Sequence, residues 1–425
     1  HSTQAHLKKV LAYVLLGVML CCPPWARAEI KPLRMPEKPS MEKLDKSALT
    51  EDFIKDLTDF SAELAAAYVS QNEGENALIS PLSVRYAFSA LAEGADGETA
   101  KLLEQFLKAK LGEDYTRANL VHKLQMEESG NQDDSKFIIK DSLWIDQKLQ
   151  PKLREEFVNK LADAHLTEVY AADKGADETA KAMDKWVSDA TNGLIQTKHK
   201  ADPNTLLTLM NTLYFKSSWE KEFNPNENYD DTFHPENGKA TETTFMSQRF
   251  DDAGYSETDK YTIADLTFRN GYRFEALLPK EGAKLSDLLS KEQAKETIAA
   301  LLTHQPQKTG KIYWSVPKYS FQSAIDLKQL ISSMGYEDLF KTNANFKKLA
   351  DADLFVSSAQ HLTNFILDNQ GVEAAAQTEI SMEAASMPVD NSNEVYMQLN
   401  KPFLYTIKAP DGSVVFVGAM YKVEK

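Results

Sequence analysis

"HLTNFILDNQGVEAAAQTEISMEAAS", residues 361–386, decides how this chain folds, and its two parts have different characters. The first eight letters have strand character. From Gly371 onward the composition is Ala, Glu, Gln and Met, which favours a helix. The pattern there is nevertheless that of a strand, because mostly apolar and mostly polar positions alternate from Val372 to Ala385. An ordinary surface helix with an accidental alternation is the alternative interpretation.

The whole chain has 425 residues, of which 42% are hydrophobic and 26% charged, as in soluble globular proteins. Length alone favours two or three domains. Residues 29–47 carry three prolines among charges and no apolar period, which predicts a flexible spacer. Residues 48–425 contain no second linker of that kind and no internal repeat, so we expect one large domain there.

The first 28 residues indicate export. Lys8 and Lys9 precede a short apolar run, and "ARA" at 26–28 supplies the small residues of a cleavage site. We therefore expect residues 1–28 to be a cleaved signal peptide, with a membrane anchor as the alternative. Cys21 and Cys22 both lie inside this segment, so the mature chain has no disulfide and no cysteine zinc site. Export without disulfides suits a secreted, extracellular protein or one of the bacterial envelope.

The formal charge is −15, and loss of the three basic residues of the signal would make it −18. This balance argues against nucleic acid as a partner. "KHK" at 198–200 is too short to be more than a solvated loop. The expected helix at 116–125 shows no basic stripe that would bind heparin.

The order of elements predicts an α+β fold. Helices are expected over residues 51–69, 81–93, 99–110, 116–125, 153–169 and 177–191. Runs of strand character follow at 205–215, 272–279, 311–321, 361–368, 402–409 and 413–421. Helices first and strands mostly later indicate large mixed or antiparallel sheets.

The sequence shows no constellation of catalytic residues. It contains no G-x-S-x-G, H-E-x-x-H or G-x-x-x-x-G-K-[ST] motif. The histidines, including His165, His199, His234, His304 and His361, lack metal-ligand spacing. We therefore expect no enzyme, no metal and no cofactor.

Six ordered segments across residues 48–425 resemble the serpin superfamily. They are "NALISPLSV" at Asn76, "GADGETAKLLEQ" at Gly94, "MNTLYFKSSWEKEF" at Met210, "VPKYSFQSAIDLKQLISSMGYEDLF" at Val316, "HLTNFILDNQGVEAAAQT" at His361 and "LNKPFLYTIKAPDGSVVFVGAMY" at Leu399. The resemblance implies the serpin fold, with about nine helices, three β-sheets and an exposed reactive-centre loop at about residues 371–398.

The resemblance also explains the ambivalent stretch. In serpins this loop is bait for a protease and later becomes a strand inside the central sheet. The small residues that inhibitory members need at the hinge are present here as Gly371, Val372, Glu373, Ala374, Ala375, Ala376 and Gln377. No bulky, cyclic or basic side chain blocks their entry between two strands.

Five further residues match serpin positions of known importance. Ser80, Ser83, Asn211 and His361 match the polar cluster below the point where the sheet opens, although each could instead be a cap or a buried structural group. Trp219 matches the tryptophan at the site of first insertion, and a core aromatic is the alternative reading.

Counting from the hinge locates the bait. In inhibitory members the residue before the scissile bond follows the hinge glycine by fourteen positions, which gives Ala385–Ser386. Met382 and Ala384 are neighbouring candidates, because the segment from Ser386 to Phe403 is longer than in many members; Met387 is disfavoured by Pro388. A small residue here implies an elastase- or subtilisin-type target.

The resemblance therefore implies a monomeric serine protease inhibitor that acts as a suicide substrate and forms a covalent complex with its target. The alternative is a non-inhibitory member that serves as a binding carrier or chaperone.

Overall fold

Helix α3 shows how the sequence builds the centre of this fold. It spans Pro81–Ala92, and its N-cap Ser80 accepts a hydrogen bond from the backbone N–H of Ser83. A proline at the first helical position is compatible with the unpaired N–H groups there. All twelve residues of α3 are buried, so the helix lies inside the molecule. The computed structural model describes residues 29–132, 134–372 and 393–423.

Nine α-helices occur in the described residues, as the resemblance implied. They are α2 (Glu51–Gln71), α3, α4 (Gly97–Leu107), α5 (Glu113–Gly130), α6 (Glu155–His165), α7 (Asp177–Ala190), α8 (Leu285–Leu288), α9 (Ala294–Leu302) and α10 (Leu327–Ile331). Short 3-10 and π turns accompany them at Met41–Lys43, Lys46–Ala48, Gln147–Lys152, Pro225–Glu227, Ser332–Tyr336 and Glu337–Phe340.

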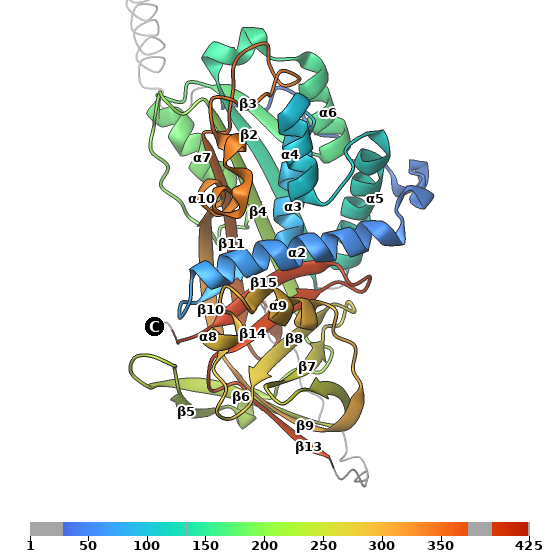
Figure 1. Ribbon diagram of the computed structural model, residues 1–425, viewed down its shortest axis with the longest axis vertical. Coiled ribbons are helices and arrows are strands. Elements are labelled where there is room, and N and C mark those ends of the chain that lie inside the picture. Colours follow the sequence, from blue (N-terminus) through green and yellow to red (C-terminus); the bar gives the residue numbers. More distant parts are fainter. Residues whose placement is uncertain (1–28, 133, 373–392, 424–425) are drawn as a thin grey trace, which may run out of the picture. The chain divides into compact units, whose positions relative to one another are not determined.

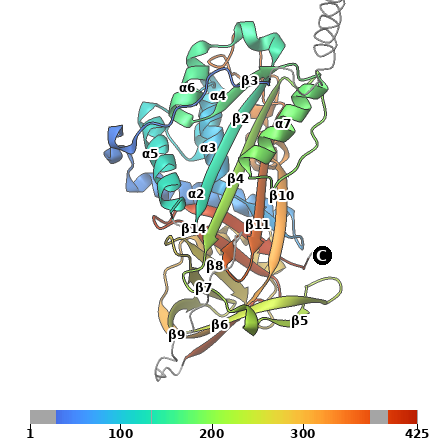
Figure 2. The same ribbon diagram turned by 180° about the vertical axis from the view of Figure 1, so that it is seen from behind.

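One of the two sheets has six strands. Its order is β10-β11-β12-β4-β2-β3, and β11 also pairs directly with β4. The strands are β2 (Lys136–Asp146), β3 (Glu168–Ala172), β4 (Leu207–Ser218), β10 (Tyr319–Asp326), β11 (Ser358–Leu367) and β12 (Gly371–Val372). Helices α2 and α3 lie in front of this sheet in Figure 1, and α7 covers its other face in Figure 2.

The second sheet has nine strands in the order β1-β15-β14-β8-β7-β6-β9-β13, with β5 paired to β6. They are β1 (Ala77–Ile79), β5 (Tyr229–Phe233), β6 (Thr241–Glu257), β7 (Tyr261–Thr267), β8 (Arg273–Pro279), β9 (Lys308–Pro317), β13 (Glu394–Gln398), β14 (Phe403–Lys408) and β15 (Val414–Met420).

The described strands thus form two hydrogen-bonded sheets where three were expected. The 17-residue strand β6 accounts for the difference. Its end pairs with β7 through Tyr255 to Glu257, whereas its earlier part pairs with β5 and β9. The register with β9 shifts between Phe250 and Ala253, so one irregular strand joins two regions of sheet.

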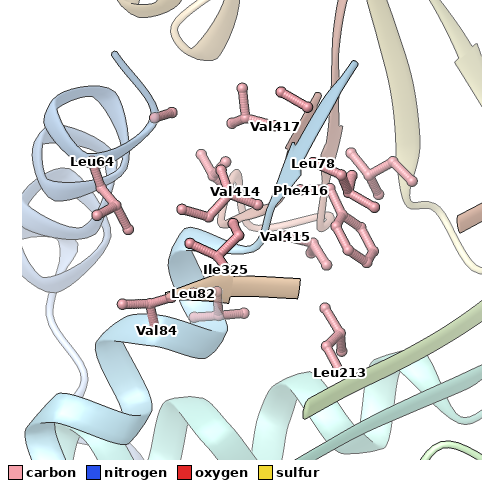
Figure 3. Close-up of a cluster of buried hydrophobic side chains, with 14 of the residues drawn as sticks. Leu64, Leu78, Leu82, Val84, Leu213, Ile325, Val414, Val415, Phe416 and Val417 are labelled. Atoms are coloured by element: carbon pink, nitrogen blue, oxygen red, sulfur yellow. The ribbon is translucent and has the colours of Figure 1, made fainter. Parts of the chain in front are cut away.

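The main hydrophobic core lies between α2, α3 and both sheets. Figure 3 shows Leu64 of α2, Leu82 and Val84 of α3 and Leu78 of β1 gathered around Val415 and its neighbours on β15. Leu213 of the six-stranded sheet reaches the same cluster, and all of these side chains are buried. Burial of apolar area on this scale is the main stabilising contribution to the fold.

The segment before α2 lies against the rest of the fold from Pro32 onward. The sequence predicted a flexible spacer at 29–47, yet Leu33 donates a backbone hydrogen bond to Val169 on the edge strand β3. Lys38 also forms an ion pair with Glu127 of α5. The described residues 29–31 belong to a separate unit and adopt no helix or strand.

Candidate functional site

The segment predicted to be the hinge begins as a short strand that lies between two long ones. Gly371 and Val372 form β12, which pairs antiparallel with Ser218 and Ser217 of β4. On its other side, Val372 pairs with Leu367 of β11. Asp368 and Gly371 close the turn from β11 through reciprocal backbone hydrogen bonds of 2.8 and 3.2 Å. The other hinge residues, Glu373 to Gln377, lie outside the described residues.

Gly371 is required by the close approach of two backbones. Its φ is +149°, and an added Cβ would lie 2.0 Å from the carbonyl oxygen of Ser217. No side chain larger than hydrogen fits there without displacing β4 or β12.

Away from β12, strands β4 and β11 pair directly with each other. Residues 208–213 of β4 run parallel to residues 358–363 of β11, and each residue has one partner. The two strands are therefore separated at one end, where β12 lies between them, and joined directly only along residues 208–213 and 358–363. A new strand could continue from β12 only if this pairing were broken.

Trp219 stands at the end where β12 separates β4 from β11. It is 1% exposed, and its ring stacks on Phe268 at 4.5 Å between centroids. Its indole N–H donates to the carbonyl oxygen of Asp368 at 3.0 Å, and its backbone N–H donates to Gln370. Trp219 thus connects the end of β4 to the turn that carries the hinge.

The polar residues predicted from the sequence come together in the middle of the sheet. Asn211 Oδ1 accepts hydrogen bonds from Ser83 Oγ at 2.5 Å and from His361 Nδ1 at 2.7 Å. His361 Nε2 accepts from the backbone N–H of Ser80 at 2.9 Å. This arrangement places the imidazole proton on Nδ1 and leaves the ring neutral. Burial lowers the pKa of His361 to about 3, which agrees with the neutral form.

Two members of this cluster were missed by sequence reasoning. Asn211 Nδ2 donates to Asp141 Oδ1 of β2 at 2.5 Å, and Asp141 Oδ2 lies 3.6 Å from Lys123 Nζ of α5. Both charged side chains are almost fully buried, and burial raises the pKa of Asp141 in spite of Lys123. Neither residue stands near its partners in the sequence, so no local signal marked them.

The predicted bait bond, Ala385–Ser386, lies outside the described residues, as do Met382, Ala384 and Met387. The chain is described again from Asn393, and β13 then pairs in parallel with β9. Within the described ranges no group of His, Cys, Asp and Glu could hold a metal ion. No helix in that part of the chain is both long and apolar enough to cross a membrane.

The family model described as "Serpin (serine protease inhibitor)" matches residues 55–423. This chain belongs to the serpin family. The match spans both sheets, the polar cluster and the hinge seat. It therefore supports a role in protease inhibition in general.

Curated serpins are similar over most of their length. Serpin A3-1 of Bos taurus is 28% identical over 370 residues, which cover 85% of this chain and 87% of the relative. Alpha-1-antiproteinase of Rattus norvegicus is 26% identical over 415 residues, covering 95% and 96%.

Solved serpin structures share the fold. Native tengpin, a thermophilic serpin, has a TM-score of 0.79 at 26% identity and covers 93% of this serpin and 100% of its own chain. Human thyroxine-binding globulin, in a complex with its ligand, has a TM-score of 0.73 at 21% identity over 88% of this serpin and 100% of its own chain. The latter likeness concerns the fold alone.

Proposed function

We propose that this serpin inhibits serine proteases of the elastase or subtilisin type as a single-use suicide substrate. The target's serine attacks the carbonyl of Ala385, and the cleaved loop then inserts between β4 and β11 before the acyl-enzyme is hydrolysed. The observation that carries this proposal is the seating of Gly371 and Val372 between those two strands.

The existing register supports insertion of the following residues. Val372 lies between Ser217 and Leu367, and continuing both pairings two residues at a time assigns later loop residues to buried positions. Ala374 would enter between Phe215 and Phe365, Ala376 between Leu213 and Thr363, and Thr378 between Asn211 and His361. Leu213 already faces Thr363, and Asn211 already faces His361, so the two sides of the new strand share one register.

The chemistry of the entering residues suits those positions. The receiving side chains are at most 2% exposed, so large or charged entrants would be excluded. The loop offers Ala, Ala and Thr there. Thr378 would also bring a hydroxyl between Asn211 and His361, whose direct hydrogen bond insertion must break.

Insertion would remove the protease from its docking site. Fourteen residues of extended chain span roughly 46 Å at about 3.3 Å each. A protease held by its acyl bond to Ala385 would be carried over that distance, and distortion of its oxyanion hole would prevent hydrolysis.

The decisive experiment mixes the serpin with pancreatic elastase, subtilisin and trypsin, each also in a serine-blocked form as control. We expect a covalent complex that survives denaturation with active elastase or subtilisin and none with the blocked enzymes. Sequencing of the released peptide should begin at Ser386. Clean cleavage with full recovery of protease activity would instead favour a non-inhibitory carrier.

We also propose that the chain is exported and that residues 1–28 are removed. The basic start, apolar run and small residues at 26–28 support this. Sequencing of the protein from the medium of expressing cells should begin at Glu29; a membrane-bound product that keeps the first 28 residues would contradict it.

A further inference from the structure

His199 connects helix α7 to strand β11 of the six-stranded sheet through two side-chain hydrogen bonds. It lies between α7 and β4, and its side chain is 11% exposed. Nδ1 lies 2.6 Å from Asp184 Oδ1 of α7, and Nε2 lies 2.8 Å from Gln360 Oε1 of β11. The sequence interpretation of "KHK" as a solvated loop holds for Lys198 and Lys200, which are exposed, but is wrong for this histidine.

Asp184 fixes the imidazole in place. The same carboxylate oxygen accepts from the backbone N–H of His199 at 2.9 Å and from Thr197 Oγ1 at 2.7 Å. The ring can bridge its partners in either protonation state. A charged ring donates from both nitrogens, and a neutral ring donates to Asp184 and accepts from a rotated Gln360 amide.

The hydrogen bonds of His199 connect the two parts of the sheet that separation of β4 from β11 would move apart. Gln360 pairs with Met210 of β4 inside the direct β4–β11 contact. Helix α7 packs over β2 and β4, as Figure 2 shows, and Asp184 belongs to that helix. Separation of β11 from β4 would therefore pull Gln360 away from His199.

An open surface pocket of about 520 Å³ lies beside the bridge, lined by His199, Gln360, Lys198, Asp326 and Lys328 among others. The segment after α7 also reaches the residue before β11, where the Leu206 N–H donates to Ser357 Oγ at 3.2 Å. The polar bridge is thus one of the contacts between this segment and the region of β11.

We propose that His199 is a latch: it holds the segment after α7 onto β11 through Gln360, and its release limits how readily β4 and β11 separate. His199 is a positioning residue for strand insertion, so this inference rests on the proposed function for its role. The latch itself exists in the intact protein and can be tested without any protease.

The test is amide hydrogen exchange of the uncleaved protein. In His199→Ala, the paired amides at 208–213 and 358–363 should exchange about tenfold faster than in the parent, while those of β14 and β15 should not change. Lys198→Ala is the matched control, because it lines the same cavity without a bridging hydrogen bond, and it should leave all of these rates unchanged. Equal rates in His199→Ala and the parent would overturn the latch.

Variants of Gln360, the partner of His199, distinguish the latch from a general structural role of the histidine. Gln360→Met removes the polar partner at similar size and should match His199→Ala, with no further increase in the double variant.

Additive effects of His199→Ala and Gln360→Met in the double variant would contradict the latch. Faster exchange without any covalent protease complex would support the latch and refute the inhibitory function, so the two proposals can fail separately.

Discussion

At the centre of the six-stranded sheet, His361 is held neutral by its surroundings. Burial lowers its pKa to about 3, whereas an unfolded histidine titrates near 6.5. Between these values the unfolded chain binds a proton that the folded chain does not. The stability supplied by the neutral ring is therefore complete above pH 6.5 and is lost progressively as the pH falls toward 3.

This predicts an acid sensitivity that one substitution should reduce. Lowering the pH from 7 to 5 should cost about 2 kcal/mol through His361 alone. His361→Gln keeps polar atoms at the site but does not titrate, so its urea unfolding free energy should fall less over the same range. An equal fall in both proteins would show that His361 is not the group responsible.

Ala376 tests the alternation of the loop at the level of one residue. Ala376→Arg would place a charge between Leu213 and Thr363, which are buried, and would cost several kcal/mol if it could not reach water. Docking of a protease at Ala385 should be unaffected. We expect conversion from inhibitor to substrate, seen on denaturing gels as the same cleavage with little covalent complex.

Gln377→Arg is the matched control, because position 377 alternates to the opposite face of the entering strand. It should retain most of the covalent complex. Inhibition by both variants at the level of the parent would show that the period-two interpretation is wrong.

At the scale of elements, β12 depends on one glycine. Gly371→Ala would force a Cβ against the Ser217 carbonyl in a backbone region that disfavours side chains. Displacement of β12 should cost about 1 to 3 kcal/mol and should weaken the Trp219 contact with Asp368. We expect more serpin molecules to be consumed per protease inhibited, measured by titration.

Gly412 supplies the control for this experiment. Its φ is +90°, so alanine is strained there too, but no atom lies within 4 Å of an added Cβ. Gly412→Ala should lower stability without changing the inhibition stoichiometry. If Gly371→Ala and the parent consumed the same number of serpin molecules per protease inhibited, a role for β12 in inhibition would be refuted.

Most elements could be predicted where the local pattern agrees with the final fold. The amphipathic period of α2 and the Ser80 cap of α3 are local signals, and the structure confirms both. Strand β2 was missed within a half that looked helical, because its second part is buried on both faces and loses the simple alternation. The joining of two sheets through β6 depends on pairings far apart in sequence.

The residues of the candidate site also divide into those that a sequence motif marks and those that only tertiary contacts reveal. The family motifs predicted Ser80, Ser83, Asn211, His361 and Trp219, and the structure brings the first four together. Asp141, Lys123 and His199 have the residue types of an ordinary surface. Tertiary contacts alone show that Asp141 and Lys123 are buried and that the His199 side chain is only 11% exposed. Sequence periodicity carries no information about such contacts.

At the scale of the whole molecule, the proposal requires that the native chain is not its most stable form. The seated hinge and the direct β4–β11 pairing would represent a kinetically trapped state, released when the loop is cut. Cleavage at the bait should therefore raise the melting temperature by tens of degrees, measured by calorimetry.

Measuring the melting temperature of Ala376→Arg before and after cleavage controls for effects of cleavage that do not involve loop insertion. That variant, cut at the same bond, should gain little heat stability because its loop enters poorly. A parent protein whose melting temperature is unchanged by cleavage would be a non-inserting member, and the carrier function would then be favoured.

The two paired residues of β12 have one more consequence, which concerns fidelity. A strand that entered one residue out of step would turn every side chain to the wrong face and bring Glu373, Glu379 and Glu383 into the interior. Val372 is already in register with both neighbours and Gly371 with β4, so under the proposed mechanism such errors would be excluded before any bond is cut. Under the same mechanism, the number of residues between β12 and Ala385 sets how far the protease is carried. Substituting residues at the scissile bond would select another protease, whereas adding or removing one residue of this segment would change that distance.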